Sequence, residues 1–266
     1  MHVHAFDRYH DAHSLVHRLD PRVKVIVTFL FILSNLLLPD GAWLGFGLSW
    51  GLILLGSVAS SLGVGYTLKR SLIALPFALA AATVLFSIPG EAIAQVQIGP
   101  LLLVITDAGL LRFTSILVRS WLSVQMAVLL VATTQFPDLL HALRHLYVPG
   151  VLVSIISFMY RYLFVLADEA MRLLRAREAR SAAADGQTSG GSLPWRARVA
   201  GNMAGQLFLR SYERSDRIYN AMLARGYNGT LLTINPHSMQ NQDWVVLLII
   251  LLLLFSFQLI GRIPGL

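Results

Sequence analysis

Cysteine is absent from this chain of 266 residues, and lysine occurs only twice, at positions 24 and 69. Without cysteine there is no disulfide framework, no thiolate metal site and no cysteine nucleophile, which fits a membrane or a reducing compartment. Neither Lys24 nor Lys69 follows the glycine-rich run of a phosphate-binding P-loop. The chain therefore cannot hydrolyse ATP by itself in that way.

Charged residues are scarce as well. They make up 13% of the chain, against about a quarter in soluble domains, whereas hydrophobic residues make up 56%. The formal charge of +7 does not indicate nucleic acid, because basic residues gather on the cytoplasmic side of membrane proteins and the aromatic residues lie mostly in apolar runs. The composition predicts an integral membrane protein that binds no nucleic acid.

Sequence patterns of common enzymes are also missing. No Ser/His/Asp grouping is apparent, and the aspartate pattern of the membrane alcohol phosphotransferases is absent. A signal peptide is not expected, because no basic region directly precedes a short apolar core and no small-residue cleavage site follows one. We therefore expect a non-catalytic membrane protein and assign it no cofactor and no metal.

Apolar runs predict five transmembrane helices. Asp20 is a natural N-cap and Pro21 suits the first helical position, so the first helix should begin here. Residues 89–108 are expected to form a loop, and the apolar stretch from Val148 to Met159 is too short to cross a membrane. Basic residues near the first span and in later loops place the N-terminus in the cytoplasm and the C-terminus outside. The expected spans are 23–38, 42–62, 72–88, 113–132 and 244–260.

The segment from Arg161 to Gly229 is a basic block. It holds eleven of the chain's 21 Lys and Arg residues against six acidic residues. Apolar residues recur at three- and four-residue steps from Leu163 to Leu174, and a second helix is expected from about Arg198 to Arg225. Glycine and proline between 185 and 194 should stop both helices. The chain is thus predicted to be an all-α integral membrane protein with about five transmembrane helices and a cytoplasmic hairpin of two long helices.

Both expected long helices end in an arginine between small residues. The first ends in Ala179-Arg180-Ser181 and the second in Ala224-Arg225-Gly226. Small neighbours let a helix end enter a groove, where the planar guanidinium can pair with a carboxylate through two hydrogen bonds. The simpler interpretation is that the arginines only complement the helix dipole and that Gly226 is a cap. The repetition of the triplet favours two equivalent docking sites.

Histidine offers a different interpretation. Five of the eight histidines lie at positions 2, 4, 10, 13 and 17, and on a helix His10, His13 and His17 would share one face that could hold a transition metal. A solvated amphipathic lead-in is the alternative. His141 and His145 have zinc-binding spacing, but Ala142 replaces the glutamate of HExxH, so residues 136–145 are expected to be a surface helix. Arg119, within the fourth span, is a functional candidate or a packing residue.

Several motifs together resemble one transporter family. The chain is similar to the transmembrane T component of energy-coupling factor transporters, and most of all to its cobalt-transport type, CbiQ. The resemblance covers nearly the whole sequence, and the paired arginine triplets are its most specific part. The first triplet has Ser181 where the family has glycine. The motifs are Leu19–Lys24, Thr133–Leu140, Tyr160–Tyr162 with Asp168 and Glu169, Ala176–Ser181, and Leu223–Gly229.

This resemblance implies a place in a larger assembly in the cell inner (plasma) membrane. Arg180 and Arg225, with their neighbours Ala179, Ser181, Ala224 and Gly226, would dock into two ABC-type ATPases (CbiO-like), which hydrolyse the ATP. The chain would transmit their motion to a substrate-binding S component (CbiM-like) accompanied by a small CbiN-like subunit. It would be divided into a transmembrane region (1–135), a coupling-helix region (136–229) and a C-terminal transmembrane helix (230–266).

Cobalt is the expected substrate, but T components for nickel or for vitamins share this architecture. A membrane-embedded metal-binding protein or enzyme that uses the N-terminal histidines, with Arg119 or with His141 and His145, is the alternative from another class. An assembly scaffold without any role in energy coupling is a third possibility.

Overall fold

A computed structural model of the chain describes residues 9–12, 14–74, 76, 81–98, 101–181, 192–229 and 239–263. Contacts divide the chain into two compact units. The bundle unit comprises Met1–Leu146 and Asn235–Leu266, and the two-helix unit comprises Tyr147–Ile234. The predicted functional division at residues 136 and 230 stays a prediction.

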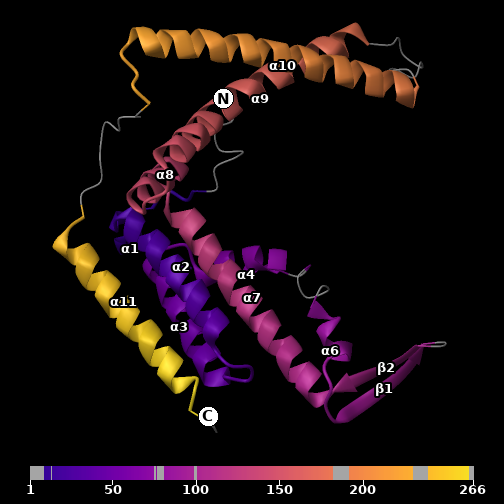
Figure 1. Cartoon of the computed structure of the whole chain (residues 1–266), viewed down its shortest axis with the longest axis vertical. Helices are drawn as coiled ribbons and strands as arrows, with labels where there is room; N and C mark the ends of the chain where they lie inside the picture. Colours follow the sequence, from indigo (N-terminus) through magenta and orange to yellow (C-terminus); the bar gives the residue numbers. More distant parts are fainter. Residues whose placement is uncertain are drawn as a thin grey trace. The chain divides into compact units, whose positions relative to one another are not determined.

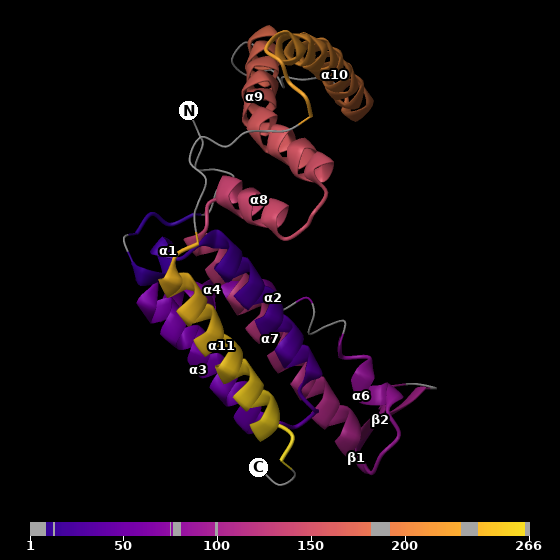
Figure 2. The same cartoon turned by 60° about the vertical axis from the view of Figure 1, so that its left-hand side comes forward.

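The bundle unit is mainly helical (Figures 1 and 2). Its helices and strands are α1 (Leu15–Arg18), α2 (Pro21–Leu37), α3 (Trp43–Ala59), α4 (Val64–Ser71), the 3₁₀ helix η2 (Leu72–Ala74), α6 (Val84–Ser87), β1 (Ala92–Ile98), β2 (Leu101–Thr106), α7 (Asp107–Thr133), α8 (Phe136–His145) and α11 (Asn241–Ile260).

The start of α2 is as predicted. The carboxylate of Asp20 accepts a hydrogen bond from the backbone N–H of Arg22 at 2.8 Å, and Pro21 occupies the first helical position. Proline costs nothing there, since that N–H would have no helical partner anyway. The expected first and second spans are thus helical, although α2 and α3 have 17 residues each and measure only about 26 Å.

Hydrogen bonds between distant residues set the directions of the bundle helices. The Asp20 N–H donates to Asp243 at 3.1 Å, and the side-chain amide of Gln258 donates to the carbonyl of Ser34, so α2 and α11 run parallel. Lys24 Nζ donates to the carbonyl of Thr133 at 3.0 Å. The end of α7 therefore lies beside the start of α2, and these two helices are antiparallel.

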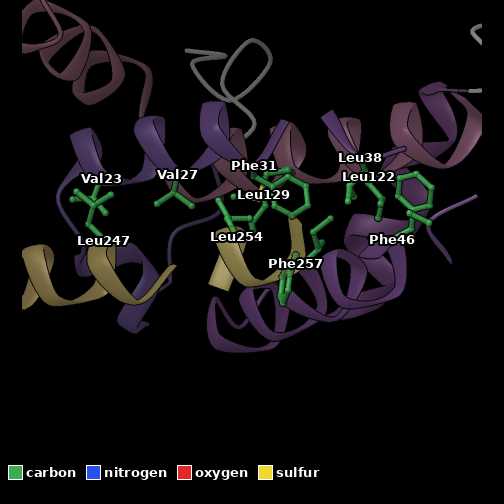
Figure 3. Packing of buried hydrophobic residues seen from close by; sticks show 13 residues of the cluster. Val23, Val27, Phe31, Leu38, Phe46, Leu122, Leu129, Leu247, Leu254 and Phe257 are labelled. Atoms are coloured by element: carbon green, nitrogen blue, oxygen red, sulfur yellow. The ribbon is translucent and has the colours of Figure 1, made fainter. Parts of the chain in front are cut away.

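The core of the bundle is made by four helices, α2, α3, α7 and α11 (Figure 3). Buried residues recur along each helix at steps of three, four or seven, which puts them on one face. Figure 3 shows that their side chains face one another in the space between the helices. They include Val23, Val27, Phe31, Phe46, Ile53, Leu122, Met126, Leu129, Leu247, Leu254 and Phe257.

The third expected span, 72–88, is not one continuous helix in the described residues. Helix α4 tightens into η2 at Leu72–Ala74, and α6 begins only at Val84. Pro76 accounts for the tightening at η2, because its ring clashes with the carbonyl four residues earlier, that of Leu72. Residues 75 and 77–80 lie outside the described part of the chain. The expected loop 89–108 also differs: it contains the antiparallel hairpin of β1 and β2.

Within the described residues, three helices are long and apolar enough to cross a membrane: α7, α11 and α9 (Gly150–Arg180). The prediction for Val148–Met159 was wrong, because this apolar stretch is continuous with the charged segment in one helix of 31 residues. No glycine or proline follows Gly150 in α9 to interrupt it. The helix is therefore apolar in its first half and charged in its second.

The two-helix unit consists of α9 and α10 (Leu193–Ala224). Helix α10 begins five residues earlier than predicted. Pro194 was expected to stop a helix, but it lies in the first turn of α10, where no helical N–H bond is lost. The predicted hairpin of two long helices is present, and the connection at 182–191 lies outside the described residues.

Candidate functional site

The two predicted docking triplets are at helix ends, as expected. Arg180 is the last residue of α9, and Arg225 directly follows the last residue of α10. Both arginines are exposed, as are Ala179, Ala224 and Gly226. None of the ion pairs between described residues involves Arg180 or Arg225. Both guanidinium groups are therefore accessible to a partner from outside the described chain.

The end of α10 is closed by Gly226. This residue has a φ of +81°, a left-handed conformation that glycine adopts without strain. Its N–H donates to Leu223 at 2.9 Å, and the N–H of Tyr227 donates to Met222 at 3.0 Å. These two bonds form a Schellman motif, which ends the helix sharply immediately after Arg225.

The end of α9 is closed in a different way. Ser181 has a φ of −108°, and its N–H and hydroxyl both donate to the carbonyl of Arg177, at 3.0 and 2.8 Å. The two triplets therefore place similar side chains at helix ends through two different caps. Both helices were expected to end in the same way. The arginine does lie at the end of each helix, but the backbone conformation after it differs between the two.

An ionic cluster links the two long helices between these ends. Glu169 of α9 accepts from Arg210 of α10 at 2.5 Å and from Arg172 at 2.6 Å. The Glu169 side chain is only 11% exposed, whereas the side chains of Arg172 and Arg210 are 60% and 55% exposed. The sequence pattern did not predict this cluster. Its only local signal is the acid–base pair at positions 169 and 172, three residues apart on one helix face.

Two grooves lie between α9 and α10. An apolar groove of about 750 Å³ is lined by residues of the first half of α9 and the second half of α10, among them Phe158, Tyr162, Phe208 and Tyr212. A groove of similar size and polar character is lined by the second half of α9 and the first half of α10, and Arg180 is one of its residues. Glu169 and Arg210 also line this polar groove.

The large side chains of the apolar groove are unusually exposed. Phe208 and Tyr212 are each 67% exposed, and Val151 and Ile155 are also exposed. Contiguous apolar surface of this kind marks a protein–protein or membrane contact, because leaving it in water is costly. The apolar groove is thus a second candidate site in the two-helix unit.

Arg119 has a packing role in the bundle unit. Its guanidinium pairs with Asp40 at 2.8 Å, donates to the carbonyl of Leu38 at 2.5 Å and lies 5.7 Å from the centre of the Phe46 ring. Arg112 lies 3.7 Å from the same carboxylate. The charge of Arg119 within α7 is therefore balanced by Asp40.

The described histidines serve the local structure. His17 Nδ1 lies 2.7 Å from the hydroxyl of Ser14, and Nε2 lies 3.0 Å from the carbonyl of His10. Burial lowers the pKa of His17, which favours the neutral ring. His141 and His145 are both in α8, where Nδ1 of His145 lies 3.0 Å from the carbonyl of His141. His2, His4 and His13 lie outside the described residues. Among the described residues, no group of three or more His, Cys, Asp or Glu side chains could hold a metal ion.

Comparison with known proteins identifies the family. The model of the family CbiQ, described as cobalt transport protein, matches residues 12–237. The energy-coupling factor transporter transmembrane protein EcfT of Heliobacterium modesticaldum is 32% identical over 248 residues, covering 88% of each chain. The cobalt transport protein CbiQ of Salmonella typhimurium is 30% identical over 150 residues, which cover 55% of this chain and 64% of that protein.

A third relative differs in its named substrate. The nickel permease LarQ of Lactiplantibacillus plantarum is 32% identical over 127 residues, which cover 47% of this chain and 44% of that protein. The family match extends over most of the sequence and includes α9, α10 and both arginine triplets. This chain therefore belongs to the CbiQ cobalt transport family and is a transmembrane T component of the energy-coupling factor type.

Proposed function

We propose that this T component couples two ABC-type ATPases to a substrate-binding S component and thereby drives cobalt uptake. The chain itself is not catalytic, and its partner chains hydrolyse the ATP. The observation that carries this proposal is the pair of exposed arginines, Arg180 and Arg225, at the ends of two long helices, without an ion-pair partner among the described residues.

The arginine triplets suit docking into acidic grooves. A guanidinium presents a rigid fork that matches a carboxylate, and alanine, serine or glycine beside it leaves space for the walls of a groove. Two separate sites on one chain correspond to two copies of an ATPase. We infer that Arg180 and Arg225 each enter one ATPase subunit, together with Ala179, Ser181, Ala224 and Gly226.

The apolar groove between α9 and α10 suits the S component. Its exposed aromatic residues, including Phe208 and Tyr212, would be covered by an apolar helix of a membrane protein. A CbiM-like S component with a small CbiN-like subunit is the partner that corresponds to cobalt. The same helix pair would then contact the ATPases at its ends and the S component along its groove.

Charge distribution supports the orientation. Arg18, Arg22 and Lys24 lie at the start of α2, and eleven arginines lie between Arg161 and Gly229, whereas the loop at 39–41 has none. Basic segments are retained in the cytoplasm. We therefore place the N-terminus, α9 beyond its apolar half, and α10 on the cytoplasmic side of the inner membrane, with the C-terminus outside.

The docking proposal is tested by affinity purification of the tagged chain together with its neighbouring gene products. Two ATPase copies are expected to accompany the unchanged chain. The double variant Arg180→Glu/Arg225→Glu should insert normally but recover less than about a tenth of the ATPase, since each reversal places a carboxylate against an acidic groove at a cost of several kcal/mol.

The matched control reverses two other exposed arginines of the same helices, Arg175→Glu/Arg217→Glu. It changes the net charge equally and should retain the ATPase. Equal loss in both double variants would mean that general charge is responsible. Full retention by Arg180→Glu/Arg225→Glu would show that these ends do not dock, and the assembly would then be at most a scaffold.

The groove proposal predicts a different loss. Phe208→Glu should reduce co-purification of the S component by about tenfold or more, because a charge would replace a large apolar contact. The ATPases should remain bound. Leu209→Glu is the control, since Leu209 is 56% exposed on the same helix but does not line the groove. Equal S component recovery in the two variants would argue against this groove as the contact.

A further inference from the structure

The ionic cluster of Glu169 lies well inside both long helices. Arg180 is eleven residues beyond Glu169 along α9, a distance of about 16 Å at 1.5 Å per residue. Arg225 is fifteen residues beyond Arg210 along α10, or about 22 Å. Both helices therefore extend for several turns on either side of the contact between Glu169 and Arg210.

The two grooves lie on opposite sides of this contact. The apolar groove is lined by α9 residues up to Leu166 and by α10 residues from Phe208 onward. The polar groove is lined by α9 residues from Glu169 onward and by α10 residues up to Arg210. The end of α9 is connected to the start of α10. Arg180 therefore lies on the side of the contact that has the polar groove, and Arg225 lies on the side that has the apolar groove. Because the two grooves occupy opposite angles of the helix crossing, a change in the crossing angle at this contact would widen or narrow both grooves together.

The chemistry of the cluster favours a fixed point. Both oxygens of the nearly buried Glu169 carboxylate are used, Oε1 by Arg210 and Oε2 by Arg172. A carboxylate held by two guanidinium groups has strong charge-assisted bonds and little freedom to move. Without it, Arg172 and Arg210 would face each other as like charges, with Arg214 one turn further along α10.

We propose that Glu169 is a positioning residue, the ionic pivot that sets how α9 crosses α10 and so relates the position of the two arginine ends to the width of the apolar groove. This proposal rests on the proposed function for its consequence in transport. Glu169 itself contacts neither substrate nor ATP. Its loss should leave the docking ends intact and weaken the transmission of motion between them and the groove.

The test uses the full complex, two variants of Glu169 and its partner, and one control variant. Glu169→Gln keeps the size of the side chain and removes its charge. Glu169→Arg/Arg210→Glu exchanges the partners and restores an ion pair between the helices. Glu213→Gln is the matched control, since Glu213 is exposed on α10 and takes part in none of the ion pairs found between described residues.

The first readout is the ratio of substrate taken up to ATP hydrolysed in liposomes. Glu169→Gln is expected to retain both ATPases and their hydrolysis but to lower this ratio at least about fivefold, a usual size for the coupling between two sites. The exchanged pair should recover most of the ratio, and Glu213→Gln should not change it. Damage to folding alone would lower ATPase recovery and would not be repaired by the exchange.

The second readout is a distance between α9 and α10. Because the chain has no cysteine, Met159→Cys and Ala221→Cys provide two unique sites for spin labels on the apolar-groove side. Pulsed electron paramagnetic resonance should give one narrow distance distribution for the unchanged pair. Glu169→Gln should broaden it and move its mean by more than about 2 Å, beyond an ordinary small helix shift. The exchanged pair should restore it.

An unchanged distance and an unchanged uptake ratio in Glu169→Gln would overturn the pivot while leaving the docking proposal intact. A changed distance with an unchanged ratio would also overturn it, because the crossing would then not control transmission. If no ATPase accompanies the unchanged chain, the proposed function fails instead. The pivot in the isolated full chain is then decided by the distance measurement, where an unchanged distribution in Glu169→Gln rejects it.

Discussion

Cells that depend on this transporter should lose cobalt uptake by at least about 100-fold when Arg180 and Arg225 are both replaced by glutamate. Truncation of one partner of a desolvated ion pair costs about 2–5 kcal/mol, and 1.4 kcal/mol corresponds to a factor of ten. Charge reversal at both helix ends would therefore remove nearly all productive complexes. Radioactive cobalt uptake, normalised to the amount of chain in the membrane, measures this effect.

The single variants add information that the double variant lacks. If the two arginine ends each bind one ATPase, as proposed, the intact end keeps the second ATPase at a raised effective concentration. Arg180→Glu or Arg225→Glu alone should therefore lose much less uptake than the double variant. The Schellman cap holds Arg225 at a sharp helix end. We therefore expect Arg225→Glu to reduce uptake more than Arg180→Glu does. Unchanged uptake in Arg225→Glu would favour a scaffold without a role in energy coupling.

The same assay decides the substrate. Nickel added in excess should leave cobalt uptake by the unchanged transporter largely intact if cobalt is the true cargo. If nickel is transported and cobalt is not, the substrate assignment is wrong. The expected effect of the arginine variants remains the same, because the proposed function places the substrate-binding site on a partner chain. Cobalt and nickel are the substrates in the names of two relatives.

Replacement of Asp243 by alanine should have the largest effect on the stability of the bundle unit. One oxygen of this buried carboxylate accepts the N–H of Asp20 at 3.1 Å, and the other accepts the N–H of Gln240 at 2.9 Å. Each buried donor left without an acceptor costs about 1–3 kcal/mol, so a total loss near 3 kcal/mol is expected. The midpoint of unfolding in a detergent titration measures it.

Two controls separate this effect from a simple loss of charge. Asp243→Asn keeps one carbonyl oxygen as an acceptor and should lose less stability than Asp243→Ala. Asp216→Ala removes an exposed carboxylate of α10, and we expect it to change the unfolding midpoint very little. If Asp243→Ala unfolds at the same detergent concentration as the unchanged chain, the two hydrogen bonds do not hold the starts of α2 and α11 together.

Local features were predictable because their causes lie within a few residues. Asp20 and Pro21 start α2 through one short hydrogen bond and a fixed φ angle, and Gly226 ends α10 because it can adopt a positive φ. The positions of Arg180 and Arg225 at helix ends followed from the same kind of signal. The expected stop at Pro194 was wrong, since proline interrupts a helix in its interior but is tolerated in its first turn.

The lengths of the helices were harder to predict. A window of apolar residues separated Val148–Met159 from the charged residues after it, yet both belong to α9. Hydropathy changes along this helix while the backbone hydrogen bonds continue, so a change in composition does not mark its end. Conversely, the described part of the apolar run at 72–88 contains the 3₁₀ helix η2 and the separate short helix α6, so a continuous apolar run does not ensure a continuous helix.

By itself, the sequence determined that this protein is helical, belongs in a membrane and presents arginine at two helix ends, since composition, periodicity and capping act over short distances. Only the tertiary structure decided that Asp243 caps the start of α2, that Asp40 balances Arg119 and that Glu169 joins α9 to α10. These contacts link residues that lie between 41 and 223 positions apart in the sequence. Their partners are chosen by the packing of whole helices, which no local pattern of residues encodes.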